Sequence, residues 1–165
     1  PWREVTSAAR HVADALREIG LVPFLKTTGG KGLHVVVPIA RRQGWPEVRA
    51  FCEAFARRQA ERAPKRFTAN MAKRQRRGRI YLDYLRNARS ATAVAAYSLR
   101  ARPGVPASTP LAWEELGAFD DARDLNWATV PERLEQADFV DPWAGIDDAA
   151  RSLTKEMQRK VQIRA

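Results

Sequence analysis

The segment TTGGKGLH, at residues 27–34, gathers groups that can bind a phosphate. Glycines, among them Gly29 and Gly30, let the backbone turn tightly and bring its N–H groups close to an anion. Lys31 adds a positive charge, and Thr28 adds a hydroxyl donor. The spacing is not that of a Walker A loop, because GxxxxGK[ST] is absent and a strand, VVVP, follows where that motif needs a helix. The turn predicts a triphosphate-binding loop of another kind, with an ordinary glycine hairpin as the alternative.

A histidine follows the glycine turn on the predicted strand LHVVV. Because side chains alternate along a strand, Leu33, Val35 and Val37 share one face and His34 lies on the other with Val36. His34 therefore projects near the turn and is a second candidate ligand for an anion. A purely structural strand histidine is the alternative.

An acid interrupts the apolar segment RIYLDYL, which has β character. Aspartate is depleted in strands and costly to bury without a partner, so Asp83 indicates either a cation or an ion pair. Arg77, Arg79 and Arg86 are close enough in sequence to form that pair. One carboxylate is too few for Mg²⁺ or Mn²⁺, which are held by two or more carboxylates with phosphate oxygens and water.

Positive charge dominates the chain, with 29 Lys and Arg against 19 Asp and Glu, a net charge of +10 and a pI near 10.6. This excess favours polyanionic partners. Arg100 and Arg102, in YSLRARPG, end an extended segment from which a guanidinium could reach a phosphate. The basic run before Asp83 is either a nucleic-acid contact or a solvated loop, and its candidate contacts are Lys73, Arg74, Arg76 and Arg77.

The hydrophobic pattern predicts an amphipathic helix up to Ile19, closed by Gly20, and then a hairpin of LVPFLK and LHVVVPI. A second helix should begin at Trp45 and Pro46 and end before Pro64. RIYLDYL reads as a strand and ATAVAAYSLR as a loop and a strand, and short helices are expected near LAWEEL, PERLEQ and IDDAARSLTKEMQRKV. We expect one domain.

The sequence disfavours a membrane-spanning protein and a secreted protein. It has no apolar run of the roughly 20 residues that a membrane span needs, and its start lacks the features of a signal peptide, so we expect a cytoplasmic protein without a membrane partner. The single Cys52 cannot form an internal disulfide and is expected to be a small buried hydrophobe.

Taken together, TTGGKGLHVVVP, RRGRIYLDYLRNARSATAVAAYSLRARPG and STPLAWEEL resemble the polymerase domain of bacterial DNA ligase D, a member of the archaeo-eukaryotic primase superfamily. The resemblance runs from Pro1 to about residue 155. It implies an α+β fold, a primase-type palm with a mostly antiparallel mixed sheet flanked by helices. It also implies that Asp83 and His34 lie on the open face of that sheet.

The resemblance assigns roles to the candidate residues. Asp83 matches a catalytic metal ligand for Mn²⁺ or Mg²⁺. The residues that match the family's nucleotide-binding positions lie in the glycine turn, the following strand and the YSLR segment, and are Thr28, Gly29, Gly30, Lys31, His34 and Arg100.

The function that the resemblance implies is nucleotide addition at DNA ends during nonhomologous end joining, by a two-metal mechanism. The implied partners are nucleoside triphosphates, DNA ends, Ku and a ligase module, in the bacterial cytoplasm at the nucleoid. The family's other metal ligands form an Asp-x-Asp pair before the segment that starts here at PWREV. Residues 1–165 are thus expected to be the C-terminal portion of one polymerase/primase domain, with little activity alone. The alternative is a noncatalytic nucleotide- or nucleic-acid-binding module that keeps the phosphate loop.

Overall fold

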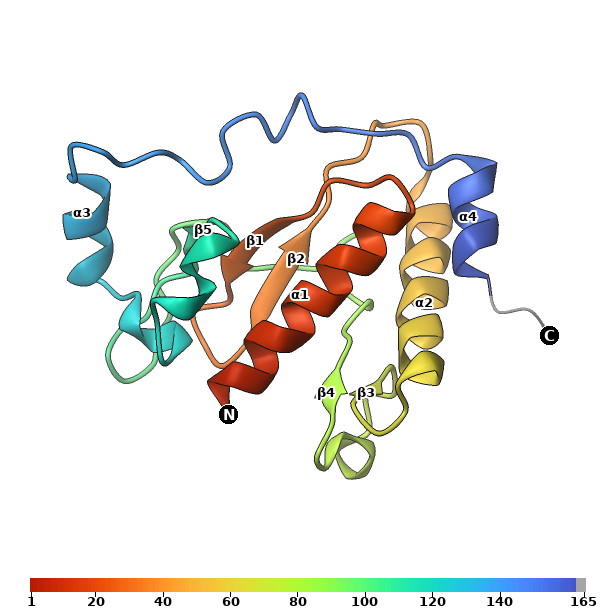
Figure 1. Ribbon diagram of the computed structural model, residues 1–165, viewed down its shortest axis with the longest axis horizontal. Coiled ribbons are helices and arrows are strands. Elements are labelled where there is room, and N and C mark those ends of the chain that lie inside the picture. Colours follow the sequence, from red (N-terminus) through yellow and green to blue (C-terminus); the bar gives the residue numbers. More distant parts are fainter. Residues whose placement is uncertain (163–165) are drawn as a thin grey trace. The chain divides into compact units, whose positions relative to one another are not determined.

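The computed structural model describes residues 1–162, and these form two compact units (Figure 1). The first unit joins Pro1–Pro38 to Val94–Ala150. The second unit joins residues 39–93 to residues 151–162. None of the helices in the described part of the chain is long and apolar enough to cross a membrane.

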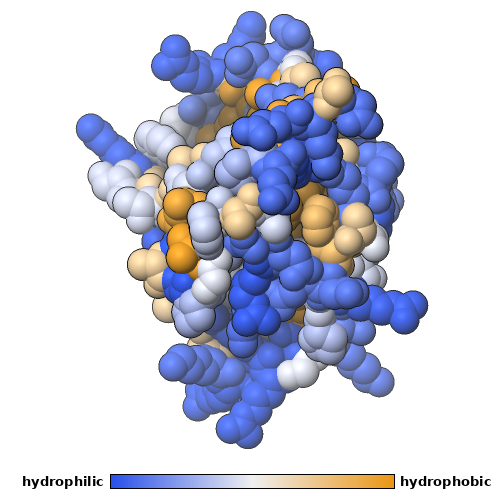
Figure 2. All heavy atoms as spheres, turned by 90° about the vertical axis from the view of Figure 1, so that its left-hand side faces the viewer, coloured by the Kyte–Doolittle hydropathy of each residue, from blue (hydrophilic) through white to orange (hydrophobic). Residues whose placement is uncertain are grey.

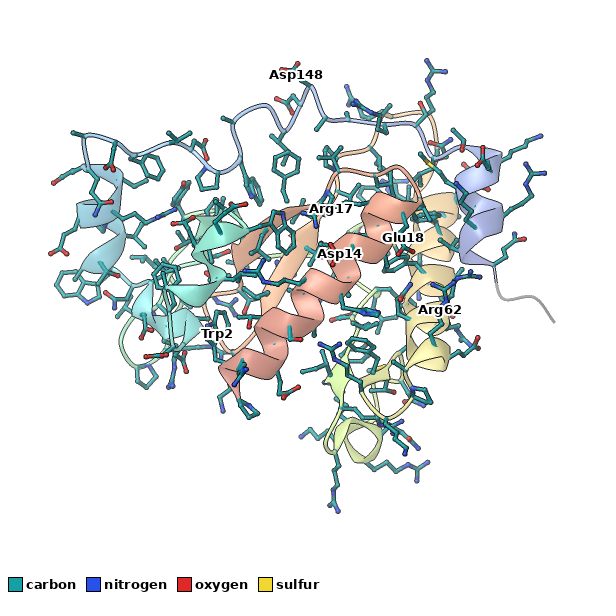
Figure 3. All side chains as sticks on the ribbon, viewed as in Figure 1. Trp2, Asp14, Arg17, Glu18, Arg62 and Asp148 are labelled. Carbon is teal, nitrogen blue, oxygen red and sulfur yellow. The ribbon has the colours of Figure 1, made fainter. Side chains whose placement is uncertain are left out.

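The first unit begins with helix α1, Trp2–Glu18, which buries one face through Ala8, Ala9, Ala13 and Leu16. Gly20 follows with a φ of 92°, which confirms the predicted glycine stop. Charged side chains occupy the outer face, where Asp14 and Arg17 form an ion pair of 2.8 Å one turn apart (Figure 3). The helix is therefore amphipathic, as its sequence pattern predicts.

A three-stranded antiparallel sheet with the strand order β2-β1-β5 forms the centre of the first unit. Strand β1 is Phe24–Thr27, β2 is Leu33–Val36 and β5 is Pro110–Leu111. The predicted hairpin is confirmed, since β1 and β2 pair with Lys26 opposite His34. The short strand β5 pairs with the other edge of β1, with Pro110 opposite Lys26.

The core of the first unit lies on one face of this sheet. Leu25 is completely buried and clusters with side chains from α1, from β5 and from the segments before and after β5, which are Ala9, Ala107, Leu111, Leu116, Leu125 and Val130. Leu33 and Val35 pack against this cluster. The predicted alternation along β2 is thus confirmed, and it leaves His34 on the face opposite this core.

A buried threonine ties the hairpin to the segment before β5. The Thr27 hydroxyl donates to the carbonyl of Ala107 at 2.9 Å and accepts from the N–H of Thr109 at 2.8 Å. The Thr27 side chain is completely buried. These bonds fix the position of residues 107–109 relative to β1.

The second unit is built around helix α2, Trp45–Arg62, whose bounds agree with the prediction. Helix α2 packs against helix α4, Lys155–Val161, and against strand β3, Phe67–Thr68. Strand β3 pairs in parallel with β4, Ile80–Tyr81, and the 3₁₀ turn η1, Lys73–Arg76, lies between them in sequence. Cys52 is half-buried on α2, where burial raises the pKa of its thiol to about 11.

Two predicted strands are largely wrong. In RIYLDYL only Ile80 and Tyr81 form a strand, because their partner β3 is itself two residues long, and Asp83 lies beyond the end of β4. In ATAVAAYSLR there is a single bridge, from Leu99 to Ala107, and the φ of 61° at Tyr97 breaks the extended backbone. The resemblance implied that Asp83 and His34 lie on one face of the same sheet. This expectation is wrong, because Asp83 is not part of a strand.

The C-terminal segments form short helices, as expected. The 3₁₀ turns η2, Glu114–Gly117, and η3, Ala122–Asp124, follow β5. Helix α3, Thr129–Leu134, contains the start of PERLEQ. In the last predicted helix only the second half is regular and forms α4.

Thr27→Val should destabilise the fold, because it leaves the buried carbonyl of Ala107 and N–H of Thr109 without their hydroxyl partner. We expect a loss of about 2–4 kcal/mol in the free energy of unfolding, measured by urea denaturation. Thr6→Val is the matched control, since the Thr6 hydroxyl donates to Arg3 at an exposed position of α1. Equal stabilities of the two variants would contradict a structural role for Thr27.

Candidate anion-binding site

The glycine turn between β1 and β2 is closed by the residue that precedes it. The Thr28 hydroxyl donates to the carbonyl of Gly32 at 3.1 Å and accepts from the Gly32 N–H at 3.4 Å. The backbone N–H of Thr28 donates to the same carbonyl. The hydroxyl predicted to contact phosphate thus also shapes the loop.

Arg100 lies directly against this turn. Its guanidinium donates through Nη1 to the carbonyl of Thr28 at 3.0 Å. Its aliphatic stem covers Gly29, where a Cβ atom would lie 2.5 Å from the Arg100 Cγ. Gly29 also has a φ of 62°, so a side chain there would be both strained and crowded. This glycine is needed for the arginine to approach the turn.

Further cations surround the turn. The Arg102 guanidinium lies over Gly30, at 3.4 Å from the position of a Cβ atom there. Lys31 is exposed at the tip of the turn. Lys31 also lies close to Asp121, whose pKa falls to about 2, mainly through hydrogen bonds from Arg123 and to a smaller extent through Lys31.

The sequence analysis missed Lys26, a buried cation beneath the turn. Lys26 is 5% exposed, and its Nζ donates to the carbonyl of Val94 at 2.7 Å and to the Ser108 hydroxyl at 2.6 Å. Its Cα pairs across the hairpin with that of His34, so the two side chains share one face. Burial, and secondly the positive charge of Arg100, lower the pKa of Lys26 to about 8.

The turn offers backbone donors as well as charge. Among residues 1–162, none accepts a hydrogen bond from the backbone N–H of Gly29, Gly30 or Lys31. Successive N–H groups in a turn with a positive φ form a concavity that suits an anion. Together with Arg100 and Arg102, this arrangement can bind a phosphate group and neutralise its charge.

The predicted nucleic-acid contacts lie in and beside turn η1 of the second unit, and they differ in their surroundings. Lys73, Arg74 and Arg77 are exposed. Arg76 instead stacks on the Tyr81 ring, with its guanidinium carbon 4.0 Å from the ring centroid, and donates to the carbonyl of Met71. Arg76 is therefore held in place by packing, whereas the other three side chains are free to reach a phosphate backbone.

Asp83 is exposed in the same unit, just past β4. Its carboxylate accepts from the backbone N–H of Leu85 at 3.0 Å and, at 3.4 Å, from the Tyr81 hydroxyl. Burial, followed by the charge of Asp83, raises the pKa of Tyr81. Within the described part of its unit Asp83 forms no ion pair with an arginine, so the predicted structural alternative of an Asp–Arg pair is wrong.

A complete site for divalent metals is not formed by the described residues alone. Within residues 1–162 there is no group of three or more His, Cys, Asp or Glu side chains that could hold a metal ion. A two-metal site needs more than one carboxylate. Asp83 could supply one ligand of such a set, but these residues alone do not fit the whole.

Most of the molecular face in Figure 2 is hydrophilic, in keeping with the net charge of +10.

The described structure brings together Thr28, Gly29, Gly30, Lys31 and Arg100 around one turn, with His34 on the adjoining strand. Asp83 and the η1 cations belong to the other unit.

Comparison with known proteins shows clear relatives. The chain is 42% identical over 161 residues to the Pseudomonas aeruginosa multifunctional non-homologous end joining protein LigD, covering 98% of the chain and 19% of that protein. It is 28% identical over 130 residues to the Bacillus subtilis bifunctional non-homologous end joining protein LigD, covering 78% of the chain and 21% of that protein. The chain thus spans about a fifth of these relatives.

A solved structure shares the fold. The polymerase domain from Mycobacterium tuberculosis ligase D in complex with DNA superposes with a TM-score of 0.79 at 30% identity, over 90% of this chain and 51% of that one. The α+β fold with antiparallel pairing predicted from the sequence is thereby confirmed. The model of the family described as "LigD, primase-polymerase domain" matches residues 1–143, and the chain belongs to that family.

Proposed function

We propose that this chain is the nucleotide-binding part of a polymerase that adds nucleotides to DNA ends in nonhomologous end joining. The observation that carries the proposal is the contact of Arg100 with the glycine turn, in a chain of the LigD primase-polymerase family. The turn and its cations suit a triphosphate, the ligand that a nucleotidyl transfer requires.

In this proposal each group in the first unit has a role. The backbone N–H groups of Gly29, Gly30 and Lys31 and the guanidinium of Arg100 bind phosphate oxygens. Lys31 and His34 add charge-assisted contacts as negative charge builds on the pyrophosphate that leaves. Thr28 keeps the loop in shape and orients its donors. The protein thus acts by positioning and electrostatics, without a covalent intermediate.

Asp83 is proposed as one ligand of a catalytic Mn²⁺ or Mg²⁺ site that is completed by carboxylates outside residues 1–162. Such a metal pair would activate the primer hydroxyl and stabilise the leaving oxygen. The exposed cations Lys73, Arg74 and Arg77 are proposed to contact the DNA backbone, with Arg76 positioned beside them. Ku and a ligase module are proposed as partners, because the relatives are end-joining proteins.

Lys31→Ala and His34→Ala should each weaken ATP binding to the chain, because each removes a charge-assisted contact. We expect a loss of roughly 1.5–3 kcal/mol, about ten-fold or more in Kd, measured by isothermal titration calorimetry. Lys155→Ala, which removes an exposed charge on α4, is the control and should bind as the unmodified chain does. Indistinguishable affinities in all these proteins would refute the assignment of the turn.

Binding to a short DNA duplex should fall steeply with salt and ignore sequence. The slope of log K against log salt should be about −0.9 for each phosphate neutralised. The triple variant Lys73→Ala, Arg74→Ala, Arg77→Ala should flatten that slope by about two to three units, whereas Arg41→Ala with Arg42→Ala should change it little. An unchanged slope in the triple variant would place the DNA contacts elsewhere.

Asp83→Asn should abolish nucleotide addition in the protein translated from the full reading frame that encodes these residues. Primer extension with Mn²⁺ should fall at least about 100-fold, because the amide carries no charge to hold the metal. The thermal unfolding midpoint should stay the same, since Asp83 is exposed, and Asp138→Asn is the matched exposed control. Undiminished extension would show that Asp83 has a structural role only.

The same assay separates the polymerase from the alternative of a noncatalytic binding module. If the protein from the full reading frame binds ATP and DNA but adds no nucleotide with either metal, the binding module is the correct function. If it extends the primer, the polymerase is.

A further inference from the structure

Lys26 is a buried titratable group that the proposed chemistry does not use. Its side chain lies on the hairpin, and its two hydrogen-bond partners, Val94 and Ser108, belong to a segment 68 and 82 residues further along the chain. Both bonds are short, at 2.7 and 2.6 Å. A buried ammonium group needs such partners, since removing it from water is costly.

The two partners of Lys26 bracket the segment that carries the arginines. Val94 begins this segment and Ser108 ends it, with Arg100 and Arg102 between them. The Ser108 hydroxyl donates in turn to the carbonyl of Thr27 at 2.8 Å. The segment 94–108 is thus fastened to the hairpin at both of its ends by one side chain.

We propose that Lys26 is a positioning residue of the anion site: its ammonium group clamps the ends of segment 94–108, aims Arg100 at the glycine turn and holds a further positive charge beneath the bound phosphates. This inference rests on the proposed function, because the anion it serves is the triphosphate. Lys26 does not touch the nucleotide. It acts through Arg100 and through the charge of the site.

The electrostatics around Lys26 favour an anion. Its charged and titratable neighbours are Arg100, from the clamped segment, and His34, opposite it on β2. No carboxylate of the described residues forms an ion pair with Lys26. The positive charges of Lys26 and Arg100 repel each other where water is largely excluded, and a bound polyphosphate would reduce that repulsion.

The test compares Lys26→Met, which keeps most of the length of the side chain but removes its charge and donors, with the unmodified chain. ATP binding should weaken by roughly three- to ten-fold in Lys26→Met at pH 7.5. Ser108→Ala, which removes one partner of Nζ, should give a smaller loss in the same direction. Lys155→Met is the control for a lost charge on an exposed helix and should bind ATP normally.

A pH series distinguishes positioning by a charged group from simple packing. Between about pH 7.5 and 9.5 a phosphate monoester, with a pKa near 6, no longer titrates, and the other titratable groups are the same in all the chains compared. Because the pKa of Lys26 is lowered to about 8, ATP affinity of the unmodified chain should fall across this range. In Lys26→Met it should stay flat, and in Ser108→Ala the fall should begin at lower pH, since the hydroxyl no longer favours the ammonium form.

Thermal unfolding gives a readout that does not depend on ATP. Because the folded pKa of about 8 lies below the ordinary 10.5, the folded chain loses this proton first as the pH rises. The unmodified chain should therefore gain stability relative to Lys26→Met as the pH rises from 7.5 to 9.5. If the difference in stability between the two chains does not change with pH, Lys26 is not the buried cation with a lowered pKa that the inference requires.

The outcomes separate the role proposed for Lys26 from the proposed function of the chain. If the unmodified chain binds ATP and Lys26→Met binds it equally well at every pH, the role of Lys26 is overturned while the proposed function stands. If the unmodified chain itself fails to bind ATP, both are overturned. Should Lys26→Met fail to fold, Ser108→Ala decides: a shifted pH profile supports the inference, and a profile identical to that of the unmodified chain overturns it.

Discussion

The buried hydrogen-bond network of Lys26, Thr27 and Ser108 is the interaction on which the arrangement of the anion site depends. The glycine turn and the arginines come from parts of the chain about 70 residues apart, as Thr28 and Arg100 show. The side-chain bonds from β1 to residues 107–109 and to Val94 help to hold these parts in register, together with the pairing of β1 with β5. Because three of these four bonds are buried and the bond to Val94 is partly buried, losing one leaves a polar group without a partner, and the network behaves as a unit.

In the proposed function, this arrangement lowers the stability of the free protein in favour of ligand binding. Lys26, Arg100 and Arg102 gather around one turn, and among the described residues no acid pairs with any of the three. By contrast, Arg133 on α3 forms an ion pair with Glu115, as arginines with a structural role commonly do. Cations left without acids cost stability in the free protein, and an anionic ligand recovers that cost when it binds. The gathering of these three cations around one turn therefore suits the anion that we propose it binds.

The sequence predicted those features that depend on local patterns. The helix stop at Gly20 and the hairpin follow from residue types within a few positions, and the structure has both. Lys26 escaped prediction, because its partners are 68 and 82 residues away and no local pattern signals them. The strand containing Asp83 was overextended for a similar reason: β-forming residues continue past Tyr81, but the length of a strand is set by its partner, and β3 ends at Thr68.

The second unit shows how tertiary packing divides residues that look alike in sequence. Arg76 and Arg77 are adjacent in a basic run, yet Arg76 lies on the Tyr81 ring while Arg77 is exposed. The same tyrosine donates its hydroxyl to Asp83, so one aromatic side chain contacts both a cation of η1 and the carboxylate. A basic loop and an acid that sequence reasoning treats as separate candidates are therefore parts of one structure. Any movement of η1 that displaces Arg76 should therefore shift the Tyr81 ring. Because the Tyr81 hydroxyl donates to Asp83, the same movement should shift the carboxylate of Asp83.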